Sequence, residues 1–146
     1  MIQANDLKIG NRFIREIPST RGQEFDHDFV LTEEWMGKLF GENTSFALND
    51  LHPIPLTPEI LEKAGLPDQE INEKGCGWFH RGNFLVGKTK YNYHFHKNSK
   101  RLTLAVVIDL ENGSDTTAFA WNIYHLHQLQ NLYFALTGQE LKINLT

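Results

Sequence analysis

The sequence predicts an α+β fold, in which a small N-terminal lobe is followed by an antiparallel β-meander of about four strands packed against a C-terminal helix. Three observations indicate this class. Helix start and stop signals frame two short segments in the first half of the chain. From Gly75 onward, apolar residues recur with a period of two, which is typical of strands. Near the C-terminus, leucines recur at steps of three and four, as on one face of a helix.

The N-terminal lobe, residues 1–56, is expected to contain a hairpin and a helix. Residues 12–17 form a short extended run, and residues 25–31 can pair back with it after a polar loop. Thr32 has the chemistry of a helix N-cap, and the two glutamates that follow it suit the positive end of a helix dipole. We therefore expect a helix over 33–40.

The second part, residues 57–146, is expected to start with another short helix. Thr57 can cap this helix, and Pro58 occupies the first helical position, where its missing N–H costs no hydrogen bond. Gly65 can end the helix. Because 146 residues is close to the roughly 150 of one domain, the two parts are predicted to form a single domain over residues 1–146.

The middle of the chain is predicted to be an antiparallel meander. Apolar and polar side chains alternate in four stretches, expected near 77–81, 84–96, 101–110 and 116–123. The segments between them have turn chemistry: 81–83, 97–100 and the Asn112-Gly113 pair, which favours a type I′ hairpin turn. Gly87 falls inside the second stretch, where a glycine is typical of a β-bulge.

A C-terminal helix is predicted from the leucine spacing between Leu126 and Leu136, with Gly138 at its C-cap. Its leucines are expected to cover the apolar face of the meander, where each buried leucine would contribute ~1.5–3 kcal/mol. Their expected partners in the sheet are Tyr93, Phe95, Leu104 and Val106. The polar side chains of the helix are expected on its outer, solvated face: His127, Gln128, Gln130 and Asn131.

Composition and charge exclude several classes of function. The 14 Lys and Arg against 18 Asp and Glu give a net charge of −4, the wrong sign for a protein that neutralises phosphates over its whole surface. The single Cys76 cannot form an internal disulfide, and the N-terminus lacks the apolar core of a secretory signal. Because no apolar run approaches the ~20 residues of a membrane helix, we expect a cytoplasmic protein that does not insert into a membrane.

Residues 82–89 match the phosphate-loop pattern G-x-x-x-x-G-K-S/T. Such a loop holds phosphates where it follows a strand and its lysine opens a helix. Here the alternation after Lys88 predicts a strand instead. We therefore expect neither a phosphate cradle nor a nucleotide cofactor.

Two His-x-His pairs are the candidate metal ligands: His94 with His96, and His125 with His127. A zinc site needs three or four converging ligands, and structural zinc sites usually include cysteine. The favoured interpretation is therefore a solvated strand face for the first pair and a helix start for the second. His127 could equally pack at the sheet edge as a neutral, hydrogen-bonded residue. A metal site built from these histidines is the alternative.

Cys76 and His80 raise the question of a nucleophile and its base, because strand alternation places both on one face. The glycines on both sides of Cys76 are more typical of a turn that enters a strand. The sequence contains no other constellation of catalytic type. An enzyme is therefore less expected than a binding protein.

The function that the sequence favours is a non-enzymatic binding or accessory module that recognises a protein partner. The candidate interaction surface is polar and lies on two elements: Lys90, Asn92, His94 and His96 on a strand, and Gln128 and Asn131 on the last helix. The alternatives are a nucleic-acid-binding accessory protein and a small metal-dependent enzyme. A nucleic-acid-binding protein would use basic residues interleaved with Tyr91 and Tyr93, as single-strand binders do. These basic residues are Lys88, Lys90, Lys97, Lys100 and Arg101.

Three stretches carry a family resemblance: residues 7–11 (LKIGN), 53–65 (PIPLTPEILEKAG) and 127–141 (HQLQNLYFALTGQEL). They resemble a family of small uncharacterised proteins from gut Bacteroidetes, often encoded in prophages and other mobile elements. The resemblance implies a bacterial cytoplasmic protein of a mobile-element kind. It implies no particular activity, cofactor or catalytic residue.

Overall fold

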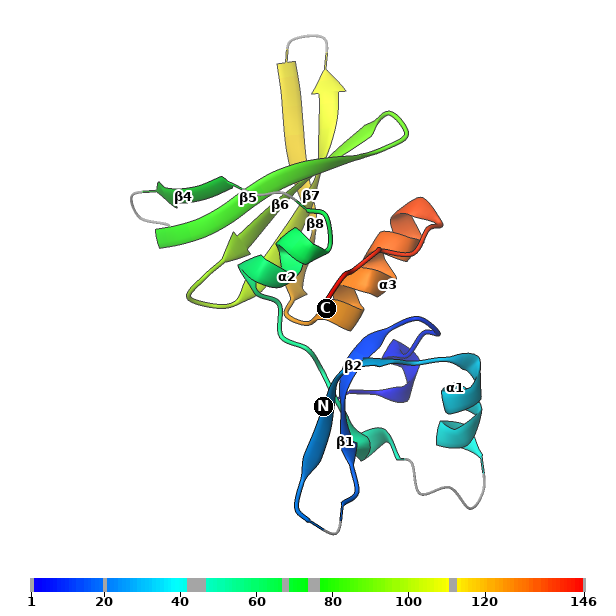
Figure 1. The fold of residues 1–146 in the computed structure, drawn as a ribbon. Coiled ribbons are helices and arrows are strands. Elements are labelled where there is room, and N and C mark those ends of the chain that lie inside the picture. Colours follow the sequence, from blue (N-terminus) through cyan, green and yellow to red (C-terminus); the bar gives the residue numbers. More distant parts are fainter. Residues whose placement is uncertain are drawn as a thin grey trace. The chain divides into compact units, whose positions relative to one another are not determined.

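The chain has an α+β fold, as the sequence predicts (Figure 1). The structure is a computed structural model and describes residues 2–19, 21–41, 47–66, 69–73, 77–110 and 113–145. With η for a 3-10 helix, the elements follow in the order η1 (Ala4–Asp6), β1 (Arg12–Ile17), β2 (Glu24–Val30), α1 (Glu33–Phe40), η2 (Leu48–Asp50), β3 (Leu51–His52), α2 (Pro58–Lys63), β4 (Gln69–Glu73), β5 (Gly77–Val86), β6 (Thr89–His96), β7 (Arg101–Leu110), β8 (Gly113–Ile123) and α3 (Leu126–Thr137).

The contacts of the chain divide it into two compact units. The first unit contains Met1–Ile54 and His125–Glu140, and the second contains Pro55–Tyr124 and Leu141–Thr146. The boundary after Ile54 lies close to the end of the predicted N-terminal lobe. Helix α3 groups with the first unit, so this unit is assembled from two stretches that are far apart in the sequence.

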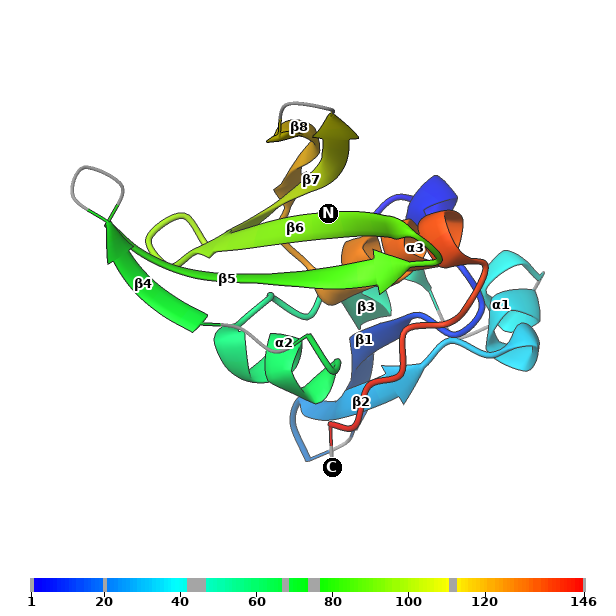
Figure 2. The ribbon, with the colours of Figure 1, turned by 90° about the horizontal axis from the view of Figure 1, so that it is seen from above.

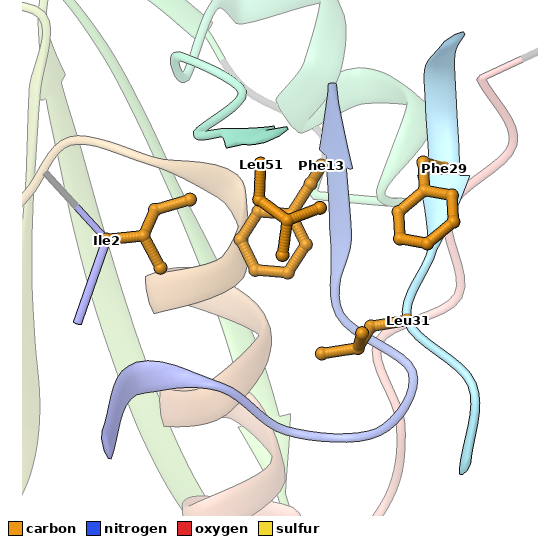
Figure 3. Packing of buried hydrophobic residues seen from close by; sticks show 5 residues of the cluster. All are labelled: Ile2, Phe13, Phe29, Leu31 and Leu51. Atoms are coloured by element: carbon orange, nitrogen blue, oxygen red, sulfur yellow. The ribbon is translucent and has the colours of Figure 1, made fainter. Parts of the chain in front are cut away.

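The first unit holds a three-stranded antiparallel sheet in the order β2–β1–β3. The predicted hairpin is present as β1 with β2, and its register shifts between Phe13 and Arg15. Strand β3 is absent from the sequence-based prediction, because two residues are too few to reveal an alternation. A cluster of five buried side chains forms the apolar core of this unit (Figure 3): Ile2, Phe13, Phe29, Leu31 and Leu51.

Both predicted short helices are present and begin at the predicted caps. In α1, the hydroxyl of Thr32 accepts a hydrogen bond from the N–H of Trp35 at 3.3 Å. In α2, the hydroxyl of Thr57 accepts one from the N–H of Ile60 at 3.2 Å, and Pro58 occupies the start of the helix. Each cap satisfies a backbone N–H that has no partner inside the helix.

The second unit contains a five-stranded antiparallel sheet in the order β4–β5–β6–β7–β8 (Figure 2). The predicted meander is confirmed, and β4 adds a strand that the sequence analysis did not include. The turn predicted at 81–83 was wrong, since these residues lie inside β5. The chain reverses at Gly87 and Lys88, where Gly87 has φ +61° and is a turn residue rather than a bulge. Asn112, predicted in the last turn, lies outside the described residues.

One face of the meander is buried within the second unit. Tyr93 and Phe95 on β6, and Leu102 and Leu104 on β7, are at most 2% exposed. The hydroxyl of Tyr93 donates a hydrogen bond to the carbonyl oxygen of Leu66, just after α2, at 2.8 Å. The same unit buries side chains of α2 and of the C-terminal segment: Leu61, Leu141 and Ile143.

Helix α3 contacts β1 and η1 in the first unit, partners that the sequence analysis did not name. The prediction of a solvated outer face was wrong for His127 and Gln130, which are each 2% exposed. Gln130 is buried because its Nε2 donates to the carbonyl of Gly10 at 3.1 Å and its Oε1 accepts from the N–H of Arg12 at 2.9 Å. A polar side chain tolerates burial where its donor and its acceptor both find partners. The buried leucines of the helix are Leu126 and Leu129.

Candidate functional site

Four of the predicted interaction residues share one face of β6. Successive side chains of a strand point to opposite faces, and the residues between these four include the buried Tyr93 and Phe95. Lys90 and His94 are exposed, whereas Asn92 and His96 are half-buried. The register adds a residue of β5 opposite Lys90 and a residue of β7 opposite His96. We call this set the β6 face: Leu85, Lys90, Asn92, His94, His96 and Arg101.

Among the large apolar residues whose side chains the structure describes, Leu85 is the most exposed, with 68% of its surface accessible. Lys90 stands between Leu85 on β5 and Val107 on β7 in the sheet register. A leucine so exposed contributes little to the core of its own unit, and its apolar surface is available for burial against another molecule. Leu85 could not be assigned to this face from the sequence, because its pairing with Lys90 depends on the turn at Gly87.

The β6 face is locally positive, although the whole chain carries a net charge of −4. Exposed Lys90 and half-buried Arg101 supply cations to this face. No Asp or Glu occurs in β6, or in residues 79–86 and 101–107 that pair with it on either side. An exposed cationic face steers an acidic surface toward it and fixes the orientation of the encounter.

The two histidines of the β6 face lie close together. Their ring centroids are 6.5 Å apart, and the rings are nearly perpendicular at 83°. Burial and, secondly, the charge of Arg101 lower the pKa of His96, so this ring is neutral at pH 7 and can both donate and accept a hydrogen bond. In the part of the chain that the structure describes, no group of three His, Cys, Asp or Glu side chains could hold a metal ion.

The second histidine pair lies at the start of α3, in the first unit. The rings of His125 and His127 are stacked, with centroids 5.9 Å apart, and the His127 ring lies 5.1 Å from that of Phe13. Burial, followed by the proximity of His125, lowers the pKa of His127 to about 4. Its Nδ1 has no hydrogen-bond partner among the described residues. His127 is therefore a neutral ring packed in the interior.

The two predicted interaction residues of α3 form hydrogen bonds within the first unit. The Oε1 of Gln128 accepts from the N–H of His125 at 3.1 Å, at the start of the helix. Asn131 donates through Nδ2 to the carbonyl of Asp6 at 2.8 Å and accepts through Oδ1 from Asn11 at 2.9 Å. Asn11 is fully buried. The Asn131 amide attaches α3 to the N-terminal segment, whereas the Gln128 amide bonds within the start of α3. The interaction role of Gln128 and Asn131 stays a prediction.

The two motifs of catalytic type both involve residues of β5. Residues 82–89 form the end of β5, a turn that contains Lys88, and the start of β6, so the prediction that a strand follows Lys88 is confirmed, whereas the predicted continuous strand through Gly87 and Lys88 was wrong. Cys76 lies outside the described residues. His80 is the register partner of Phe95 in the sheet. The interpretation of Cys76 and His80 as a nucleophile and its base stays a prediction.

Comparisons with protein-family models, with curated proteins and with solved structures found no match to this chain. Among the described residues, none of the helices has the length and apolar character needed to cross a membrane. The fold and the chemistry of the β6 face are therefore the basis for any functional conclusion.

Proposed function

We propose that this chain is a non-catalytic binding module that recognises an acidic protein surface through the β6 face. The observation that carries the proposal is Leu85, exposed over 68% of its surface beside a polar row that contains cations and no carboxylate. Interfaces commonly combine one apolar anchor with polar groups that fix orientation. In this proposal Leu85 is the anchor, and Asn92 and His94 are the orienting groups.

The residues of the β6 face indicate which chemical groups a partner would present. A surface that presents an apolar pocket or patch flanked by Asp or Glu would bury Leu85 and place carboxylates near Lys90 and Arg101. The apolar contact supplies most of the affinity, whereas the exposed charges mainly raise the association rate and set the register. The association should therefore slow as salt is added. Together with the family resemblance of the sequence, a face suited to a protein partner supports the proposal of a cytoplasmic accessory protein of a mobile element.

A nucleic-acid partner receives less support from the geometry. Tyr93 is 1% exposed and its hydroxyl is hydrogen-bonded to Leu66, so its ring cannot stack on a base. Tyr91 stacks on Phe84, with ring centroids 5.3 Å apart, and alternates with Lys90 along β6. The tyrosines and Lys90 of the proposed basic-aromatic patch therefore lie on opposite faces of the sheet.

Site-specific photo-crosslinking in cells that naturally produce the protein tests the proposal. A photoreactive residue at position 85 is expected to trap one protein, identified by mass spectrometry. The matched control carries the same group in place of Phe40, which is 62% exposed on α1 in the first unit, and should not trap that protein. The purified partner should then bind the wild type, with affinity reduced about tenfold or more by Leu85→Asp and unchanged by Phe40→Asp.

Two results would contradict the proposal. In one, position 85 traps no protein that position 40 does not trap equally. In the other, the purified chain binds an oligonucleotide at low salt, with affinity that falls steeply as salt is added and that Lys90→Gln weakens. The second result would establish the nucleic-acid alternative.

A further inference from the structure

A cavity of about 510 Å³ lies in the second unit, lined by the segment that leads into α2, by the end of β6 and by the turn after it. Its volume falls within the ~300–1,000 Å³ of typical small-molecule sites. Six lining residues define its chemistry: Pro55, Pro58, Phe95, Glu59, Lys97 and Lys100. None of them belongs to the β6 face, so the cavity is independent of the function proposed above.

The walls of the cavity are held in place by the fold. Pro55 and Pro58 each fix their own backbone φ angle. Between them, Leu56 is fully buried, and its N–H donates to the carbonyl of Tyr124 at 2.9 Å. Phe95 is 2% exposed, in the middle of the sheet. A cavity with walls fixed in this way loses little conformational freedom when a ligand enters, which favours binding.

The charged residues give the cavity a net positive charge. Lys97 and Lys100 contribute two cations, and Glu59 contributes one carboxylate, so the balance is one positive charge in a chain whose net charge is −4. Lysine ammonium groups act as point charges that suit any small anion. The surrounding prolines and Phe95 favour an apolar group beside that anion.

We infer that this cavity binds the carboxylate of a small ligand whose adjoining group is apolar. The carboxylate lies near the ammonium groups of Lys97 and Lys100, and the apolar group lies against Pro55 and Pro58. Glu59 opposes a second negative charge, which disfavours dianions such as phosphate. A free aromatic or aliphatic acid and the C-terminus of a peptide share this chemistry.

Two-dimensional NMR titration of the full chain tests the inference. With 3-phenylpropionate as the probe, saturable shifts are expected at the amides of Glu59, Lys97 and Lys100. The neutral 3-phenylpropanamide, which has the same apolar group, should not produce them at the same concentrations. An acetylated peptide that ends in phenylalanine, compared with its C-terminally amidated form, distinguishes the peptide source from the free acid.

Three variants separate charge from shape. Lys100→Asn removes one cation and suits the left-handed backbone at this position, where φ is +54°; it should weaken binding of the acid about tenfold, as the loss of a charge-assisted hydrogen bond does. Glu59→Gln removes the opposing carboxylate and should tighten binding about twofold. Lys88→Gln, in the turn between β5 and β6, is the matched control and should have no effect.

The inference is overturned by any of four results. The first is the absence of saturable binding of both acids, and the second is equal binding of 3-phenylpropionate and its amide. The third is binding of inorganic phosphate as tight as that of the acid, which would show that the apolar wall plays no part. Failure of Lys100→Asn to weaken binding, in a variant whose spectrum is otherwise that of the wild type, has the same consequence.

Discussion

Two rows of polar side chains, one on α3 and one on β6, are both expected from their periodicity to face solvent, and the structure places them in different environments. On α3, His127 and Gln130 are each 2% exposed. On β6, Lys90 and His94 are exposed. Periodicity identifies which residues share a face, but it does not reveal whether another part of the chain covers that face.

Available hydrogen-bond partners explain the difference between the rows. Gln130 meets the carbonyl of Gly10 and the N–H of Arg12, and Asn131 meets the carbonyl of Asp6 and the amide of Asn11. A buried amide with such partners costs little free energy. The α3 row therefore stabilises the first unit, whereas the β6 row is the one that we propose for recognition of a partner.

The largest predicted effect is a loss of stability on acidification, which acts through His127 of the α3 row. The pKa of His127 is about 4 in the folded chain and roughly 6.5 when unfolded. Between these values the unfolded chain binds a proton that the folded chain does not. The contribution of His127 to the free energy of unfolding is therefore greatest above pH 6.5 and should fall by about 3 kcal/mol as the pH approaches 4. Urea denaturation at a series of pH values measures this loss.

The variant His127→Phe assigns the acid sensitivity to this ring. Phenylalanine retains a ring next to Phe13 and removes the unpartnered Nδ1. It should leave stability at pH 7 within about 1 kcal/mol of the wild type and remove most of the loss toward pH 4. The matched variant His94→Gln, on the exposed row, should retain the loss because His127 is intact. A persistent loss in His127→Phe would contradict the assignment.

A smaller effect is expected from Gln130→Leu. Leucine nearly preserves the volume but leaves the carbonyl of Gly10 and the N–H of Arg12 without their partner, at a cost of about 2 kcal/mol. Native-state hydrogen exchange at the amides of β1 reports the stability of the first unit. The control Gln139→Ala replaces an exposed glutamine after α3 and should change exchange by less than about 0.5 kcal/mol. Equal effects of the two variants would show that the buried amide is not a structural contact.

Much of the fold could be predicted because the signals are local. Thr32 and Thr57 each lie only three residues before the N–H group that they cap. The alternation that predicts β6 lies entirely within the strand. Strand β4 was missed because Gln69–Glu73 contains a single apolar residue, Ile71, and so has no alternation to detect. The turn at Gly87 was missed because an earlier glycine, Gly82, offered similar chemistry.

The candidate site also has features that could be predicted from the sequence and features that could not. The shared face of Lys90 and His94 follows from strand geometry alone and could be predicted. The burial of Gln130 could not, because its partner Gly10 is 120 positions away in the sequence. The cavity likewise combines Pro55 and Pro58 with Lys100, and only the folded chain reveals that these segments share a site.

The smallest effect on stability is expected on the β6 row, from Lys90→Gln. Lys90 is exposed, and exposed substitutions of this kind change the free energy of unfolding by less than about 0.5 kcal/mol. Hydrogen exchange at the amides of β6 and β7 should therefore match the wild type. The same variant should slow association with the acidic partner, most clearly at low salt, because it removes a cation from the face that steers the encounter. A loss of stability as large as that of Gln130→Leu would mean that Lys90 supports its own sheet, and the distinction between a structural row and a recognition row would then fail.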